Sequence, residues 1–92
     1  MAYAVYVIRS ESTGQIYIGQ TANLDNRLRQ HNDPDFGGTL HTKRRAGPWR
    51  VVHSEVFATR AQAVGRERYL KSAAGRRWIR RSVLVDEVGE TR

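Results

Sequence analysis

Arg27 and His31 lie four residues apart in a segment that reads as a helix. Residues at this spacing are neighbours on one helix face, so the cation and the imidazole stand together. The apolar pair Leu24 and Leu28 lies about 60° round the same helix, which leaves the polar pair beside the buried stripe. Tyr17 ends an apolar run just upstream. A guanidinium, an imidazole and a phenol in this arrangement are suited to binding phosphate.

Two strands and a helix must position these groups. Residues 3–8 and 16–20 are short runs rich in aromatic and β-branched residues, and a Ser, Thr and Gly turn separates them. If Ser10 pairs with Gln15, Ile8 faces Tyr17 and Tyr6 shares that face of the sheet; a one-residue slip would separate the two phenols. The first strand is apolar on both faces, so we expect it to be covered on both. Capping residues precede a helix at 23–32, which Asp33-Pro34 ends.

The second half repeats the alternation of strand and helix. Residues 33–48 read as a long loop and 49–57 as a third, valine-rich strand. Thr59-Arg60-Ala61-Gln62 has the spacing of a capping box, and we expect the helix it opens to end at Gly75. A short basic helix follows at 76–83, anchored by Trp78 and Ile79. The predicted core positions of the longer helix are Ala63, Val64, Leu70 and Ala74.

These elements predict an α+β (α/β) fold, a three-stranded antiparallel sheet flanked by helices in the order β-β-α-β-α-α. We expect residues 1–82 to form one domain and 83–92 to be a frayed tail. The chain has no cysteine and no apolar run long enough to cross a bilayer, so we expect a cytoplasmic protein without a membrane partner.

The net charge of +7 is concentrated in residues 36–85, which hold twelve Lys and Arg against two acids. A basic block of this density predicts a polyanionic partner, most often nucleic acid. No element for reading bases is evident, so we expect contacts to the backbone and little sequence specificity. The candidate contacts are Lys43, Arg44, Arg45, Lys71, Arg76, Arg77, Arg80 and Arg81.

Glu67 is one of the two acids in this block, and it falls inside the apolar stripe of its helix. A carboxylate there should be paired, bound to a metal, or at the edge of the stripe. One interpretation is an ordinary helix pair with Lys71, worth about 0.2–0.5 kcal/mol. The other is a single Mg²⁺ ligand, because this ion often binds through one carboxylate and completes its shell with water and substrate phosphate.

Two tripeptides, Ala4-Val5-Tyr6 and Tyr17-Ile18-Gly19, are separated by ten residues. In this the sequence resembles the GIY-YIG nuclease family, which is named for two tripeptides at about this separation; here Ala4 and Val5 replace Gly and Ile. Arg27, His31 and Glu67 also match the family's site positions. The resemblance covers roughly residues 3–82 and is nearest to small, stand-alone members. Some members carry an asparagine about ten residues beyond the glutamate, and residues 76–79 contain none.

The resemblance implies a metal-dependent endonuclease that hydrolyses DNA with one Mg²⁺ or Mn²⁺ at Glu67. It assigns Tyr6 as general base, Tyr17 as a holder of water or phosphate, and Arg27 as a phosphate clamp. His31 would orient Tyr6 or the water, or protonate the leaving oxygen. Without the motif, the tyrosines would read as core aromatics, Arg27 as a solvated cation and His31 as a helix C-terminal residue interacting with the dipole.

Two other functions stay open. One is a module that binds DNA or RNA without cleaving it. The other is a nuclease subunit that needs a protein partner, and the sequence also leaves a homodimer open. We favour DNA over RNA as the substrate. We also expect the structure of the DNA, rather than its base sequence, to direct cleavage.

Overall fold

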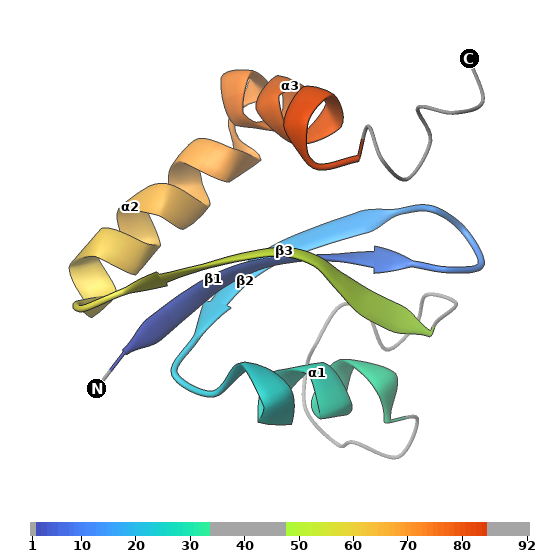
Figure 1. Ribbon diagram of the computed structural model, residues 1–92, viewed down its shortest axis with the longest axis horizontal. Coiled ribbons are helices and arrows are strands. Elements are labelled where there is room, and N and C mark those ends of the chain that lie inside the picture. Colours follow the sequence, from blue (N-terminus) through green and yellow to red (C-terminus); the bar gives the residue numbers. More distant parts are fainter. Residues whose placement is uncertain (1, 34–47, 85–92) are drawn as a thin grey trace.

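The computed structural model describes residues 2–33 and 48–84. In chain order the elements are β1 (Tyr3–Ser10), β2 (Ile16–Thr21), α1 (Leu24–Asn32), β3 (Trp49–Phe57), α2 (Arg60–Lys71) and α3 (Ala73–Ser82) (Figure 1). The three strands form an antiparallel sheet in the order β2-β1-β3. This confirms the predicted fold class and element order.

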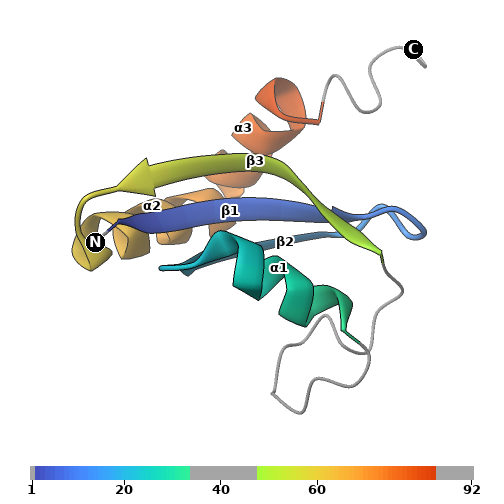
Figure 2. The ribbon, with the colours of Figure 1, turned by 60° about the horizontal axis from the view of Figure 1, so that its bottom comes forward.

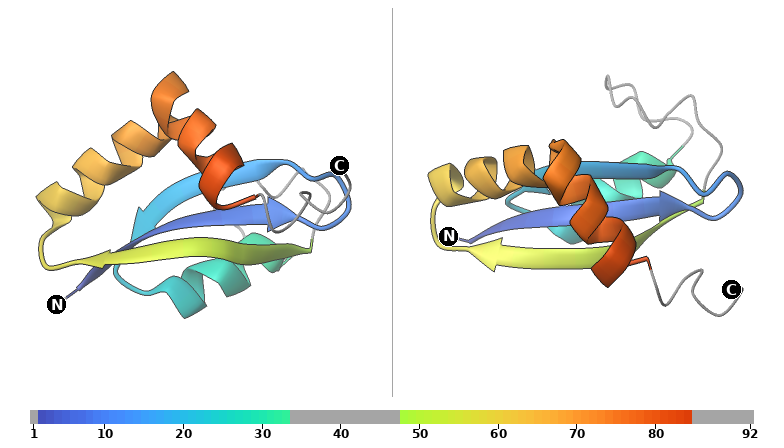
Figure 3. Two further views of the ribbon diagram at one scale, coloured as in Figure 1. Left: turned by 45° about the horizontal axis from the view of Figure 1, so that its top comes forward. Right: turned by 90° about the horizontal axis from the view of Figure 1, so that it is seen from above.

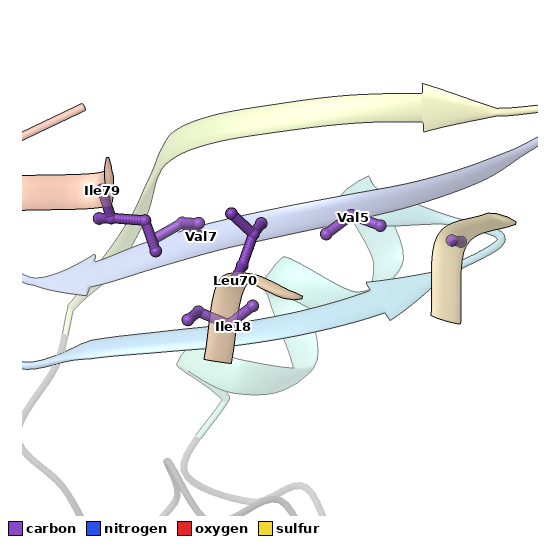
Figure 4. Close-up of a cluster of buried hydrophobic side chains, with 6 residues drawn as sticks. Val5, Val7, Ile18, Leu70 and Ile79 are labelled. Carbon is purple, nitrogen blue, oxygen red and sulfur yellow. The ribbon is translucent and has the colours of Figure 1, made fainter. Parts of the chain in front are cut away.

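The sheet is covered on both faces. Helix α1 lies on one face, and α2 and α3 lie on the other (Figures 1 and 2). Side chains of the central strand β1 alternate between them: Val5 and Val7 pack with Leu70 and Ile79 under α2 and α3, while Tyr6 and Ile8 face α1. Figure 4 shows the first of these clusters, which also contains Ile18. The expectation that β1 is buried on both faces is therefore confirmed.

The β1–β2 hairpin has the register that the sequence favours. The backbone N–H of Ser10 donates to the carbonyl of Gln15 at 2.9 Å. Ile8 then pairs with Tyr17, and Tyr6 pairs with Gly19. Since paired residues point to the same face of a sheet, both phenols lie on the α1 face.

Helix α1 is fixed at both ends. The Asn23 side chain accepts from the N–H of Asn26 at 3.0 Å, which caps the first turn. At the other end, the Asn32 amide donates to the Trp49 carbonyl at 2.9 Å and accepts from the Trp49 N–H at 2.7 Å. These two bonds attach the end of α1 to the start of β3.

Helix α2 starts as predicted but ends earlier. Thr59 and Gln62 form the capping box, and Ala63 and Leu70 are buried. The helix stops at Lys71, however, because the Ser72 hydroxyl accepts from the N–H of Gly75 and begins α3. The prediction that α2 ends at Gly75 is therefore wrong, and so is the core assignment of Ala74, which is an exposed residue of α3.

Gly75 does not end α2 as predicted; it lies in the first turn of α3, where it allows close packing against α2. A Cβ at this position would lie 2.0 Å from the Tyr69 carbonyl oxygen and 2.5 Å from the Cα of Leu70. The missing side chain lets the first turn of α3 pack directly on the end of α2. The two helices consequently meet at a sharp angle over the sheet (Figure 3).

Two predictions concern segments that the structure describes in part. Within the predicted tail, Val83 and Leu84 are half-buried against the α2–α3 cluster. The rest of that tail, and residues 34–47 of the predicted loop, lie outside the described residues. No helix among the described residues is long and apolar enough to span a membrane.

Candidate active site

Tyr6 and Gly19 are directly paired across the hairpin, and Gly19 makes room for the phenol. A Cβ on Gly19 would lie 2.6 Å from the Tyr6 hydroxyl oxygen and 3.2 Å from a ring carbon of Tyr17. Real Cβ atoms essentially never approach another atom as closely as the 2.6 Å to the Tyr6 oxygen. The Tyr6 ring therefore lies across the backbone of β2 because position 19 has no side chain.

The Tyr6 hydroxyl is hydrogen bonded to His31 of α1. Its oxygen lies 3.0 Å from Nε2 of a histidine that is itself buried. The half-buried Tyr17 ring lies beside both partners, with its centroid 4.9 Å from that of His31 and 6.3 Å from that of Tyr6. Two phenols and an imidazole from β1, β2 and α1 thus form one contiguous group.

The electrostatics of this group keep Tyr6 protonated. Burial raises the pKa of the Tyr6 phenol above its ordinary value of 10.0, and the Tyr17 phenol raises it further. The Arg27 guanidinium lowers this pKa, whereas the Glu67 carboxylate raises it. Tyr6 is therefore a neutral phenol at physiological pH, able to donate one hydrogen bond and to accept others.

Arg27 and Glu67 act electrostatically on the Tyr6 phenol from helices on opposite sides of the sheet. Both lie near enough to affect the ionisation of Tyr6, although Arg27 is on α1 and Glu67 on α2. Arg27 is half-buried, and no carboxylate pairs with it in the described part of the chain. A half-buried guanidinium without an acidic partner is suited to binding an anion.

Glu67 forms the helix pair with Lys71 that one of the two sequence interpretations predicted. Its carboxylate accepts from the Lys71 ammonium at 2.8 Å, and the Glu67 side chain is 20% exposed. The pair does not exclude a metal ligand, because an exposed i,i+4 pair is weak and easily exchanged. Residues 2–33 and 48–84 contain no group of three or more His, Cys, Asp or Glu that could hold a metal ion. A metal at Glu67 would therefore have at most two such ligands among these residues.

The predicted nucleic-acid contacts fall into two sets. Lys43, Arg44 and Arg45 lie outside the described residues. The others are exposed on the end of α2 and on α3; they are Lys71, Arg76, Arg77, Arg80 and Arg81. Within this set, the Arg76 guanidinium donates to the Lys71 carbonyl at 3.1 Å. These side chains belong to the helical layer on the sheet face opposite α1 (Figure 1).

Sequence reasoning missed two residues that position this group. The sequence placed Gly19 in the second strand without a structural purpose, whereas its missing side chain leaves the space that the Tyr6 ring occupies. Asn32 follows His31 and attaches that end of α1 to β3. The tight pairing of Gly19 with Tyr6 could have been found from the hairpin register. Nothing in the local sequence identifies Trp49 as the partner of Asn32.

The two phenols and the imidazole thus gather on one sheet face of a small α+β domain. The family model described as the GIY-YIG catalytic domain matches residues 2–80. The chain therefore belongs to the GIY-YIG family.

Several known proteins are similar to this chain. A UPF0213 protein of Haloquadratum walsbyi is 37% identical over 68 residues, which cover 74% of this chain and 72% of that protein. A Drosophila melanogaster protein named structure-specific endonuclease subunit SLX1 homolog is 45% identical over 56 residues, or 54% of this chain. The match spans 18% of that longer protein. The solution structure of a UPF0213 protein of Bacillus halodurans is 25% identical and gives a TM-score of 0.49, covering 84% of this chain and 80% of its own.

Proposed function

We propose that this protein is a metal-dependent endonuclease that hydrolyses phosphodiester bonds in DNA and is directed by DNA structure rather than sequence. The observation that supports this most is the hydrogen-bonded pair of Tyr6 and His31 beside Tyr17, within electrostatic range of Arg27 and Glu67. This set contains a proton acceptor, an anion-binding cation and a hard oxygen ligand, which together suit phosphodiester hydrolysis.

Tyr6 and His31 would act on the attacking water as a pair. A phenol with a raised pKa is a poor base by itself, because forming phenolate in a buried position is unfavourable. When His31 Nε2 is unprotonated, however, Tyr6 can donate its proton to the imidazole while its oxygen accepts the proton of a water. Tyr6 would thus be the general base, as the sequence resemblance implies, and His31 would receive the phenol proton.

Arg27 and Tyr17 would hold the scissile phosphate. The guanidinium presents several donors to phosphate oxygens and compensates the negative charge that develops in the transition state. The Tyr17 hydroxyl would add a hydrogen bond to the same phosphate or to the attacking water. Neither group needs to change its protonation state, so their task is orientation and charge stabilisation.

The residues present fit one hard divalent cation, Mg²⁺ or Mn²⁺, on Glu67. A partly exposed carboxylate whose partner is a single surface lysine offers an accessible oxygen ligand. Such an ion would supply Lewis-acid stabilisation and lower the pKa of bound water. With one protein ligand, affinity in the absence of DNA should be low, because substrate phosphate must complete the shell.

A second candidate is a nuclease subunit that acts with a protein partner. It is favoured by the similarity to proteins whose name describes a structure-specific endonuclease subunit, which match this chain over 18% of their length in Drosophila melanogaster. In this case the catalytic group would be the same, and the partner would supply DNA affinity or structural specificity. A purified chain with an intact fold and no activity would favour this candidate.

A panel of labelled substrates tests the proposal. It contains duplex, nicked, flapped, branched and single-stranded DNA and the matching RNAs, each incubated with Mg²⁺, with Mn²⁺, or with a chelator. We expect metal-dependent cuts in DNA at positions set by the junction and unchanged when the sequence is permuted. Tyr6→Phe should retain binding and lose most of the cleavage. DNA or RNA bound without cleavage under all conditions would favour the binding module or the subunit.

A further inference from the structure

A pocket of about 270 Å³ lies between α2 and α3, and none of its lining residues takes part in the proposed mechanism. Its size is below the usual range for whole small-molecule ligands, about 300–1,000 Å³, and suits one flat ring system. The Tyr69 side chain at its rim is 43% exposed, which is high for a large aromatic residue. The lining residues are Tyr69, Ala74, Arg77, Trp78, Arg81 and Ser82.

The two aromatic rings of the pocket are held by a chain of contacts that starts on β3. Glu55 accepts two hydrogen bonds from Arg66, at 2.8 and 3.0 Å. The Arg66 guanidinium lies 5.3 Å from the Tyr69 ring centroid and 5.2 Å from the Trp78 centroid. His53 binds Glu55 at 2.7 Å and packs edge-on against Trp78 at 5.3 Å. The rings are thus positioned before a ligand arrives, which reduces the entropy cost of binding.

The charge at the pocket is positive. Arg77 and Arg81 are one turn apart on α3, a spacing that places their Cβ atoms about 5–6 Å from each other. Arg80 lies next to Arg81 and is exposed, and among the residues that the structure describes no acid lines the pocket. A flat aromatic surface beside two guanidinium groups matches a base and its neighbouring phosphates. Stacking on aromatic rings combined with cations along the backbone is how proteins bind single strands.

We propose that this pocket binds one unpaired nucleotide of the DNA substrate, with its base stacked on Tyr69 and its flanking phosphates on Arg77 and Arg81. The inference rests on the proposed function in taking DNA as the nucleic acid. Bases in a duplex are already stacked and do not present a free face, so the pocket distinguishes a flap or single-stranded end from paired DNA. It is a physical basis for structure-directed cleavage without base reading.

The position of the pocket relative to Glu67 is compatible with binding a nucleotide of the same DNA strand. Tyr69 lies two residues beyond Glu67 on α2, about 200° round the helix. The pocket is therefore separated from the Glu67 side chain by roughly one helix diameter, about 10–12 Å. A single strand of a few nucleotides that leaves the active site around α2 can reach the pocket.

Equilibrium binding without divalent metal tests the pocket separately from cleavage. The probes are a paired DNA duplex and the same duplex with a single-stranded flap containing 2-aminopurine, whose fluorescence falls when it stacks. Tyr69→Ala should weaken flap binding by about 5- to 100-fold relative to duplex binding and abolish the quenching. Tyr69→Phe keeps the ring and should keep both signals. Val56→Ala truncates an apolar side chain on β3 that is even more exposed, at 68%, and should leave the affinity ratio unchanged.

Arg81→Gln gives an independent reading if Tyr69→Ala proves unstable in a thermal melt. It should reduce the salt dependence of flap binding, with a slope about 0.7 smaller for each lost phosphate contact in a single strand. Equal losses for flap and duplex in Tyr69→Ala, or quenching that persists, would overturn the proposal. A loss seen with an RNA flap and absent with DNA would also overturn it. If wild type never cleaves DNA but Tyr69→Ala still loses flap preference, the pocket stands and the proposed nuclease function fails.

Discussion

The Tyr6 ring lies across Gly19, and the Tyr6 hydroxyl oxygen is 2.6 Å from where a Gly19 Cβ would be. Gly19→Ala should therefore displace the phenol and break its hydrogen bond to His31. Because the Tyr6 side chain can shift at its far end, we expect a stability loss of about 1–3 kcal/mol and cleavage reduced about 100-fold. Thermal melts and cleavage rates measure the two effects.

Gly14→Ala on the hairpin turn is the matched control, because Gly14 has a positive φ of 78° and the atoms nearest to a Cβ there belong to Arg9 rather than to the phenols. It should lower stability through backbone strain and leave the cleavage rate per folded molecule nearly unchanged. A Gly19→Ala protein with wild-type cleavage would show that Tyr6 does not need its observed position.

Asn32→Ala should loosen the neighbouring His31, which we propose receives the proton from Tyr6. The substitution removes both hydrogen bonds to Trp49, at 2.9 and 2.7 Å, that attach the end of α1 to β3. Each bond contributes about 0.5–1.5 kcal/mol, so the free energy of unfolding should fall by about 1–3 kcal/mol. His31 lies next to this anchor, and the cleavage rate should fall with it.

Asn26→Ala on the same helix is the control for Asn32→Ala, because its side chain contacts Arg29 on the surface. It should change stability by less than about 0.5 kcal/mol. Equal stabilities of the two alanine variants would contradict the anchoring role of Asn32.

Much of the fold follows from periodicity, turns and caps. Ser10 and Gln15 determine the hairpin register, and the capping box at Thr59 determines where α2 begins. The end of α2 was not predictable from these patterns. Ser72 ends α2 and also caps α3, and Gly75 allows the two helices to pack closely. Such contacts between helices depend on packing distances that a local pattern does not contain.

The candidate site was predictable to a different extent for each residue. Tyr6 and Tyr17 share a face because of the hairpin, and His31 follows from α1 spacing. Glu67 and Tyr6 come from opposite faces of the sheet, so their electrostatic contact needs the tertiary structure. The Glu55–Arg66 pair was missed because it joins β3 to α2 across eleven residues with no periodic signal.

Glu55 should make stability depend on acid pH. The hydrogen bonds from Arg66 lower the pKa of the Glu55 carboxyl below its ordinary value of 4.5. This contribution is complete above about pH 4.5 and is lost as pH falls through the lower folded-state pKa. Glu55→Gln should therefore melt below wild type near neutral pH, by about 4–8 °C for each kcal/mol lost.

The difference between wild type and Glu55→Gln should shrink in acid, where wild type has lost the charge as well. Melting curves over a pH series measure it. A difference in melting temperature that is constant from neutral pH to well below pH 4.5 would show that the Glu55 charge does not stabilise the fold.

The basic face of α3 should make DNA binding depend on salt. Replacing Arg80 and Arg81 with Gln should weaken binding to all duplex sequences alike and flatten the slope of log affinity against log salt by about 0.9 per lost phosphate contact. The double variant of Arg50 and Arg60 is the control with the same charge loss. Arg50 pairs with Glu11 at 3.4 Å and Arg60 lies over Tyr3. The Arg50 and Arg60 double variant should therefore keep the wild-type dependence of DNA affinity on salt. Identical slopes for both double variants would exclude α3 as a backbone-binding face.

Glu67→Gln, compared with wild type in cleavage of one flapped DNA across a Mg²⁺ titration, tests the nuclease account most directly. Gln keeps the shape of the side chain and removes the charge that would hold the metal. We expect cleavage to fall about 100-fold or more at every Mg²⁺ concentration, while DNA affinity in a chelator stays equal or rises. If Glu67 serves the Lys71 pair alone, the variant loses about 0.2–0.5 kcal/mol of stability and cleaves like wild type. Equal cleavage by the two proteins would contradict the metal-dependent mechanism.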